Sequence, residues 1–371
     1  MKRRPIDFLA LCFGGLIIFG LIALASASSV WATQDKGEPF YYFTHQLLYG
    51  LLPGLIGFIA ARMIPLKFFQ VGAPFFYIAS IVLLGLVFVP GLHYEYGGAR
   101  RWLDFGSFSF QPSEMAKIGV ILFLASWLAR QGRQKLSTWR FGVLPFIALT
   151  GVPLILILLE PDVGTAAILA ATTGLMYFAA GARWRHLVIL FIAALLMVGS
   201  VVALSPHRWD RIETFFNPNQ DTLKSSYQIN QSLVAIGSGG LFGRGLGQSR
   251  QKYSYLPEPA GDTIFAIIAE ELGFAATILM VLVYLAIAYL GARAAAVVQN
   301  DFSKYLILGI IGLIVIQAFI NMMAVTAILP FTGVPLPFIS YGGTALATLI
   351  TSLGLVFSAA TGFQGSAKKR Y

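Results

Sequence analysis

The sequence predicts an all-α polytopic membrane protein with about ten transmembrane helices, organised as a single integral-membrane domain over residues 1–371. Two observations support this prediction. Of the residues, 57% are hydrophobic and 11% are charged, whereas a soluble domain carries about 25% charged residues. Apolar runs of roughly 17–25 residues, the length that crosses a bilayer, recur along the whole chain. A soluble protein with a large core is therefore strongly disfavoured.

The apolar runs predict ten spans, and each is bounded by polar residues, glycine or proline. The first run follows a basic start but is too long for a typical signal sequence, so we interpret it as a retained span. A long polar loop at about 206–261 separates the seventh span from the eighth. The predicted spans are 6–30, 42–62, 67–90, 112–129, 141–159, 164–182, 187–205, 263–292, 305–330 and 340–362.

The basic residues predict the orientation. Ten spans place both termini on one side, and most of the 26 Lys and Arg residues then lie on that side. By the positive-inside rule both termini are cytoplasmic, and the long loop is extracytoplasmic. The charge of +10 is thus a topology signal, and no nucleic-acid partner is expected. The sixteen residues are Lys2, Arg3, Arg4, Arg62, Lys67, Arg130, Arg133, Lys135, Arg140, Arg183, Arg185, Arg293, Lys304, Lys368, Lys369 and Arg370.

Glu114 and Lys117 begin the fourth span and share one helix face, because they are three residues apart. One interpretation is a local ion pair at the membrane edge. The other is a polar cavity, since ionisable groups inside spans seldom face lipid. Arg101, just upstream, suits a phosphate-bearing ligand. In the short turn after the fifth span, Asp162 caps the next helix in one interpretation and orients a base or binds a cation in the other.

The long loop is basic and rich in glycine. Its segment QINQSLVAIGSGG predicts a short amphipathic helix on the membrane surface. The following GSGGLFGRGLG matches no nucleotide-binding loop, because it lacks both GxGxxG and GK[ST]. We interpret it as a flexible loop whose amides approach an anionic headgroup, helped by Arg244, Arg250 and Lys252.

Four acids follow in YSYLPEPAGDTIFAIIAEELGF. Asp262, at the start of the eighth span, is either a helix cap or a general base, since partial desolvation raises a carboxyl pKa towards neutrality. Helical geometry puts Glu270 about 80° around and about 12 Å deeper, so the two acids are expected to line one cavity. Glu271 should then meet a different helix or loop, and Glu258 is expected to be a solvated loop charge.

The segment after the ninth span, with Pro330, Pro335 and Pro337, predicts a broken hairpin at membrane depth. Such a backbone must be buried in protein or line a polar cavity. Ser340 adds a hydroxyl near its end and is a candidate for substrate binding. The four histidines are scattered and predict no metal set.

Five stretches, in order, resemble the SEDS family (shape, elongation, division and sporulation), and the likeness covers nearly the whole chain. They are GARRWLDFGSFSFQPSEMAK, EPDVGTA, SGGLFGRGLGQSRQKYSYLPEP, DTIFAIIAEELG and TGVPLPFISYGGTAL. The wording of FSFQPSE and SRQKYSYLPEP is closer to the FtsW branch than to the RodA branch. One departure is that the family often has His-Thr-Asp-Phe where this chain has Ala260, Gly261, Asp262 and Thr263.

The resemblance implies a peptidoglycan glycosyltransferase in the bacterial cytoplasmic membrane, with its active site outside. Its substrates would be lipid II and a lipid-linked glycan chain, and its partner a class B penicillin-binding protein. The family's essential aspartate corresponds to Asp262, and its other characteristic polar residues to Glu114, Lys117 and Asp162. Asp262 would act as base, or would hold a divalent cation, Mg²⁺ or Mn²⁺, that assists.

Two other functions remain open at this point. A lipid II flippase would also use broken spans and an intramembrane Glu270. A scaffold that recruits a transpeptidase would need no chemistry of its own. The polar groups gather at the predicted outer face, which favours the polymerase, since a flippase needs a hydrophilic path through the inner half of the membrane.

Overall fold

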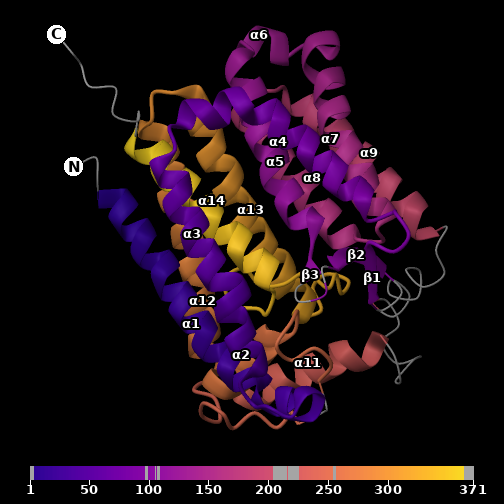
Figure 1. Cartoon of the computed structure of the whole chain (residues 1–371), viewed down its shortest axis with the longest axis vertical. Coiled ribbons are helices and arrows are strands. Elements are labelled where there is room, and N and C mark those ends of the chain that lie inside the picture. Colours follow the sequence, from indigo (N-terminus) through magenta and orange to yellow (C-terminus); the bar gives the residue numbers. More distant parts are fainter. Residues whose placement is uncertain are drawn as a thin grey trace.

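The computed structural model describes residues 4–96, 99–104, 106, 109–203, 215, 225–253 and 256–362. Long helices run roughly side by side in one bundle (Figure 1). In chain order the helices are α1 (Arg4–Lys36), α2 (Tyr41–Gln46), η1 (Leu47–Leu51), α3 (Leu52–Met63), α4 (Leu66–Leu86), α5 (Pro112–Arg130), α6 (Arg133–Leu136), η2 (Trp139–Val143), α7 (Leu144–Leu159), α8 (Val163–Ala179), α9 (Trp184–Ala203), α11 (Ser225–Gly239), α12 (Ile264–Val297), α13 (Asp301–Val325) and α14 (Gly343–Thr361).

Each of the ten predicted spans corresponds to a helix or to a continuous helical stretch. Within the described residues, eight stretches are long and apolar enough to cross a membrane, and two shorter apolar helices, Val163–Ala179 and Trp184–Ser200, complete the set. The start of α1 and the end of α14 lie at the same end of the bundle (Figure 1), as an even number of spans requires. The chain is therefore a multi-pass, largely helical membrane protein.

The segment between α4 and α5 contains a small sheet that the sequence did not predict. Its strands are β1 (His93–Tyr96), β2 (Ala99–Asp104) and β3 (Ser109–Phe110), paired antiparallel in the order β1-β2-β3. They lie towards the end of the bundle opposite to α6 (Figure 1). The sheet places Arg101 of β2 next to the turn between α7 and α8.

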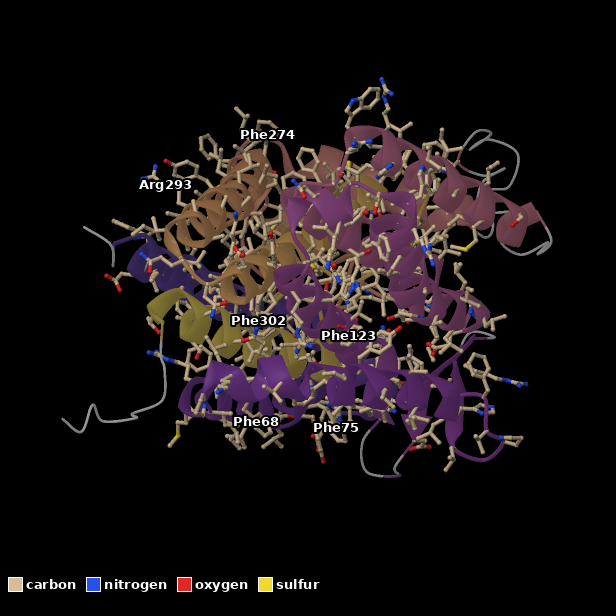
Figure 2. All side chains as sticks on the ribbon, turned by 90° about the horizontal axis from the view of Figure 1, so that it is seen from above. Phe68, Phe75, Phe123, Phe274, Arg293 and Phe302 are labelled. Carbon is tan, nitrogen blue, oxygen red and sulfur yellow. The ribbon has the colours of Figure 1, made fainter. Side chains whose placement is uncertain are left out.

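Side-chain burial separates the bundle interior from the surface that faces lipid. Phe302 is buried inside, whereas Phe68, Phe75 and Phe274 project outwards and are more than half exposed (Figure 2). Among the helices long enough to span a membrane, α5, α13 and α14 are the most buried. About two thirds or more of the most apolar stretch of each lies inside the protein. The polar side chains described below come mainly from the inner faces of α5 and α13, where lipid does not reach them.

Helix α12 is broken at Gly273, whose φ of 77° lies in the left-handed region that glycine tolerates. The segment after α11 fills this break. Arg244 and Gly245 donate their backbone N–H groups to the carbonyls of Glu270 and Glu271, at 3.0 and 2.9 Å. In return, Phe274 and Ala275 donate to the carbonyls of Gly240 and Leu241, at 2.9 and 3.1 Å. The backbone groups freed by the break are thus paired with a neighbouring loop, as a membrane environment demands.

Candidate active site

The broken hairpin between α13 and α14 lies against polar side chains of the surrounding helices. Gln317 donates to the carbonyl of Pro335 at 3.0 Å, Asn321 to that of Val334 at 2.8 Å, and Tyr284 to that of Pro337 at 2.7 Å. From α2, Gln46 donates to the carbonyl of Ser340 and accepts from the N–H of Gly342. These bonds hold an irregular backbone inside the protein, and they confirm the predicted break in the chain.

Asp262 lies in the turn just before α12, against this hairpin. The amide of Asn321 that binds Val334 also donates to the backbone carbonyl of Asp262 at 2.8 Å. One oxygen of the Asp262 carboxylate accepts a hydrogen bond from the side-chain amide of Gln228 in α11 at 3.4 Å. The other oxygen faces Gly333 and would lie 3.5 Å from a Cβ atom added to that glycine. The carboxylate therefore lies between α11 and the hairpin, while Asn321 of α13 holds the backbone of Asp262.

Glu114 and Lys117 form a buried ion pair in the first turns of α5. Lys117 Nζ lies 2.9 Å from Glu114 Oε1 and donates to Gln317 Oε1 at 2.9 Å. Since Gln317 also binds Pro335, a continuous hydrogen-bonded chain leads from Glu114 to the hairpin beside Asp262. The pair faces the protein interior, because both side chains are almost fully buried.

The turn between α7 and α8 brings a third polar group to the same hairpin. Asp162 caps α8, accepting from Thr165 N and Oγ1 at 3.0 and 2.9 Å. Arg101 lies 3.9 Å from the Asp162 carboxylate and donates to the carbonyls of Glu160 and Pro161. Two residues on, Gly164 packs against Val334 and Thr332, where a Cβ would clash.

Glu160, in that turn, is fully buried, and neither of its carboxylate oxygens has a hydrogen-bond partner. The pKa of its carboxyl is raised to about 9, mainly because burial disfavours the charged form. The negative charge of Asp162 also raises this pKa, and the positive charge of Arg101 lowers it. The group is therefore a neutral acid at pH 7. In this form it can donate a proton, a property that the sequence did not reveal.

Several buried acceptors around the hairpin lack a partner among the described residues. Such atoms have hydrogen-bonding capacity that a ligand, a water or a proton can use. They are Glu114 Oε2, both carboxylate oxygens of Glu160, Asn321 Oδ1 and Thr332 Oγ1. Together with Asp262 they make the region around residues 332–335 the candidate active site.

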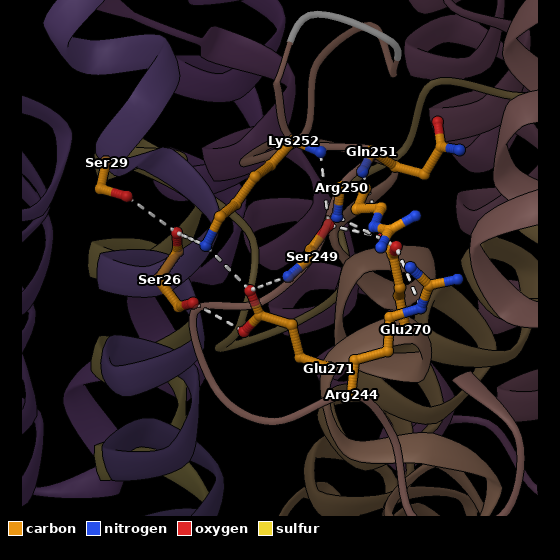
Figure 3. Close-up of polar contacts among 9 residues, drawn as sticks. All are labelled: Ser26, Ser29, Arg244, Ser249, Arg250, Gln251, Lys252, Glu270 and Glu271. Atoms are coloured by element: carbon orange, nitrogen blue, oxygen red, sulfur yellow. Dashed lines mark hydrogen bonds and ion pairs between the residues drawn. The ribbon is translucent and has the colours of Figure 1, made fainter. Parts of the chain in front are cut away.

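Glu270 and Glu271 belong to a separate cluster, which we call the clamp (Figure 3). Glu270 accepts from Ser249 Oγ and from the backbone N–H groups of Arg250 and Gln251, at 2.5 to 3.3 Å. Glu271 accepts from Ser26 Oγ of α1 at 2.6 Å and pairs with Lys252 Nζ at 3.0 Å. The clamp therefore fastens the segment 249–252 to both α12 and α1.

The clamp corrects the geometry predicted for Glu270. That prediction counted helical turns from Asp262, but Asp262 lies in a turn and α12 begins only at Ile264. Glu270 consequently faces the 249–251 segment rather than sharing the pocket of Asp262. The prediction that Glu271 meets a different helix is confirmed by its bond to Ser26.

The three residues of the long loop that were predicted to bind an anion differ in their burial and in their partners. Lys252 is buried in its ion pair with Glu271. Arg244 lies 3.8 Å from Glu270 and donates to the carbonyl of Ser238, and its backbone N–H fills the break in α12. The glycine-rich amides therefore bind α12, contrary to the prediction of a flexible headgroup loop. Arg250, whose side chain is exposed, and Arg101, whose side chain is partly exposed, remain candidates for binding an anion.

Ser340 holds the hairpin together, because its hydroxyl accepts from the backbone N–H of Leu336 at 2.8 Å. The amphipathic helix predicted for QINQSLVAIGSGG is α11, which packs on α12. The long loop was predicted over about 206–261, and its part from 206 to 224 lies outside the described residues, apart from Phe215.

Four neutral amides that organise the site were not among the residues predicted from the sequence. Gln46, Gln228, Gln317 and Asn321 all contact the hairpin or Asp262. Gln46, Gln317 and Asn321 lie within apolar spans, and such amides are rare enough there to have been a usable signal. Within the described part of the chain, no three His, Cys, Asp or Glu side chains come together to hold a metal ion.

Comparison with known proteins agrees with this architecture. The family described as cell cycle protein, comprising FtsW, RodA and SpoVE, matches residues 7–364. Stage V sporulation protein E of Bacillus subtilis (strain 168) is 38% identical over 343 residues, 92% of this chain and 93% of the relative. A probable peptidoglycan glycosyltransferase FtsW of Geobacter sp. (strain M18) is 35% identical over 352 residues, 95% of each chain.

Two solved structures share the fold. One is a chain described under the structural coordination of polymerization and crosslinking by a peptidoglycan synthase complex. It matches with a TM-score of 0.79 and 26% identity, over 96% of this chain and 98% of the other. The other is the rod shape determining protein RodA of Thermus thermophilus, with a TM-score of 0.70 and 26% identity over 96% of each chain. The chain therefore belongs to the FtsW, RodA and SpoVE family, as its resemblance to the SEDS proteins predicted.

Proposed function

We propose that this protein polymerises lipid II, a disaccharide-pentapeptide on undecaprenyl pyrophosphate, with Asp262 as the general base. The protein is a peptidoglycan glycosyltransferase, as its membership of the family and its FtsW relatives indicate. The observation that supports Asp262 most strongly is its position, where the hairpin, α11 and the start of α12 meet around one carboxylate.

In the proposed reaction the 4-hydroxyl of the acceptor lipid II attacks C1 of the lipid-linked glycan chain. The bond from C1 to the pyrophosphate oxygen breaks, and undecaprenyl pyrophosphate leaves with the bonding electrons. Asp262 takes the hydroxyl proton, a role that typically contributes about 10²–10⁴-fold to the rate. The surrounding bonds to Asn321 and the hairpin keep this base in place, so that little reorganisation is needed during the reaction.

The leaving pyrophosphate needs positive charge nearby. Lys117 and Lys252 are each neutralised by a buried glutamate. Arg101 is better suited, because it is partly exposed and adjoins the turn at Asp162. We assign it the pyrophosphate, and we assign Glu114 and Lys117 the task of holding the hairpin through Gln317.

The distribution of charge supports a bacterial cytoplasmic membrane location with both termini inside. Sixteen of the 26 basic residues then lie on the cytoplasmic side. Asp262 and the hairpin lie at the opposite face, where the polymer must form. The structural relative from a synthase complex that couples polymerization to crosslinking supports a transpeptidase, a class B penicillin-binding protein, as the partner.

The test uses purified protein in lipid nanodiscs, supplied with labelled lipid II, alone and with the presumed transpeptidase. We expect polymer from the wild type and none from Asp262→Asn at equal amounts of folded protein. Normal polymerisation by Asp262→Asn would remove the base assignment. Transfer of lipid II across vesicles without any polymer would favour a flippase, and neither activity would favour a scaffold.

A further inference from the structure

A cavity of about 280 Å³ adjoins the segment that leads into Asp262. Its volume is near the lower end of the range of roughly 300–1,000 Å³ found for small-molecule sites. One wall comes from the end of α1 and the other from the segment before Asp262. The lining residues are Trp31, Gln34, Lys252, Leu256, Pro257, Glu258 and Pro259.

Trp31 provides a rigid aromatic surface to this cavity. Its ring stacks on that of Tyr42, with centroids 4.3 Å apart and an interplanar angle of 7°. Tyr42 is fixed in turn by a hydrogen bond from its hydroxyl to Asp35 at 2.5 Å. A braced indole can bind a flat, weakly polar face without losing much conformational entropy.

Glu258 provides a carboxylate that can accept hydrogen bonds from a ligand in the cavity. The backbone of Glu258 is strained. Its φ of 51° lies in the left-handed region, which a non-glycine residue adopts only when its surroundings enforce it. The carbonyl of Glu258 accepts from Thr263 Oγ1 at 2.8 Å and from Gly261 N at 2.9 Å. A Cβ at Gly261 would lie 3.3 Å from Glu258 Oε2, so the glycine leaves room for this carboxylate beside Asp262.

We propose that this cavity is a subsite for a neutral sugar ring of the glycan that is being elongated. The ring would stack on Trp31 and donate hydroxyl hydrogen bonds to Glu258, with Gln34 as a further polar neighbour. The inference rests on the proposed function, because it assigns this site to the carbohydrate part of the same substrate. It also gives a role to Gly261, where the family often has a larger residue.

The charges around the cavity favour a neutral ligand over an anion. Lys252 is the only cation among the lining residues, and Glu271 neutralises it at 3.0 Å. The carboxylate of Glu258 has oxygen lone pairs that accept hydrogen bonds from sugar hydroxyls, whereas a phosphate or a second carboxylate offers it no donor. A pyrophosphate or an acidic peptide stem is therefore disfavoured here.

The experiment measures binding of a soluble β-1,4-linked N-acetylglucosamine tetrasaccharide to the full chain in nanodiscs by calorimetry. Trp31→Phe and Glu258→Gln should each weaken binding at least tenfold. Their matched controls, Trp184→Phe and Glu38→Gln, alter exposed residues and should bind like the wild type. With lipid II as substrate, both cavity variants should make shorter strands, whereas Asp262→Asn should make none.

Glu258→Gln keeps the shape of the side chain, so the test survives if Trp31→Phe folds poorly. Equal binding by the wild type and both cavity variants, no binding by the wild type, or displacement of the sugar by inorganic pyrophosphate would each overturn the subsite. If the wild type polymerises lipid II in those cases, the proposed function still stands. If it binds the tetrasaccharide through Trp31 and Glu258 but never polymerises, the subsite stands and the proposed function fails.

Discussion

Two groups of buried glutamates in this protein are partnered very differently. In the clamp, all four carboxylate oxygens of Glu270 and Glu271 accept hydrogen bonds, and Lys252 and Arg244 lie close by. Around the hairpin, Glu114 has one oxygen without a partner and Glu160 has two. Burial alone therefore does not distinguish a structural acid from a reactive one, since all four side chains are almost fully inside the protein.

The difference indicates which cluster can interact with a ligand. A fully satisfied polar network rigidifies a fold, and little of its bonding capacity remains for a substrate. An unsatisfied acceptor has spare capacity, at a free-energy cost that persists only where a ligand, water or proton compensates for it. The clamp is thus a fixed support for the segment that ends at Asp262, and the hairpin region is the reactive part.

The largest loss of stability is expected from Gly273→Ala, at the break in α12 where the segment 240–245 is bonded next to the clamp. The new Cβ would come 2.3 Å from Gly243 N and 2.6 Å from Leu241 O, and its φ of 77° would strain the alanine. Four backbone hydrogen bonds join the segment 240–245 to α12, and they depend on the close approach of Gly273 to this segment. Each buried backbone group left unpaired costs about 1–3 kcal/mol. Thermal unfolding in detergent should show a marked drop in Tm.

Gly85→Ala is the matched control, because its Cβ would meet nothing within 4 Å and Gly85 lies in regular helix. It should leave Tm within a few degrees of the wild type. A Gly273→Ala protein as stable as Gly85→Ala would mean that the loop does not hold α12 in this way.

The next largest effect is expected from Lys117→Ala in the hairpin region. The change leaves the Glu114 carboxylate buried without its cation, and breaking such a pair costs about 3–5 kcal/mol. Polymerisation should fall with stability, because Gln317 and the hairpin lose a contact as well. The double variant Glu114→Gln with Lys117→Met should be less damaged than Lys117→Ala. If the losses of the single variants Glu114→Gln and Lys117→Met simply add up in the double variant, the two residues act independently.

The smallest loss of stability is expected from Glu160→Gln, whose effect is on the pH dependence of stability. The pKa of Glu160 is raised from an ordinary 4.5 to about 9 by burial, so the folded state holds a proton that the unfolded state has lost between these values. Stability should therefore fall as the pH rises through this window. The glutamine resembles the protonated acid in both states, so the variant should lose less stability than the wild type between pH 6 and pH 9.

Thermal unfolding from pH 6 to 9 measures this slope directly. Glu38→Gln, at an exposed position, should keep the slope of the wild type. A Glu160→Gln protein with that same slope would show that Glu160 is ionised in the folded protein.

Most of the fold could be predicted from the sequence, because membrane-spanning helices depend on long apolar runs. All ten spans were located, within several residues at each end. The break at Gly273 could not be predicted, because it depends on Gly243 and Leu241 approaching from another part of the chain. The sheet β1–β3 was also missed, since its short strands lie in a segment rich in glycine and aromatic residues.

The site was predicted less completely. The residue types identified Asp262, Glu114, Lys117 and Asp162 as candidates, and the structure brings their segments together around one hairpin. Glu270 was placed wrongly because local helical geometry was extended across a turn. Asn321 and Gln317 were missed, since a neutral amide has no charge to mark it and its role comes from the backbone carbonyls that it contacts.

The most direct test compares polymerisation per folded molecule in Asp262→Asn and Glu271→Gln. Purified variants in nanodiscs would receive equal lipid II, with folded protein measured by thermal unfolding in the same samples. The account predicts that Asp262→Asn is as stable as the wild type and inactive, whereas Glu271→Gln is less stable and retains activity in its folded fraction. Activity in Asp262→Asn, or its complete loss in a fully folded Glu271→Gln, would contradict the division between a reactive hairpin region and a structural clamp.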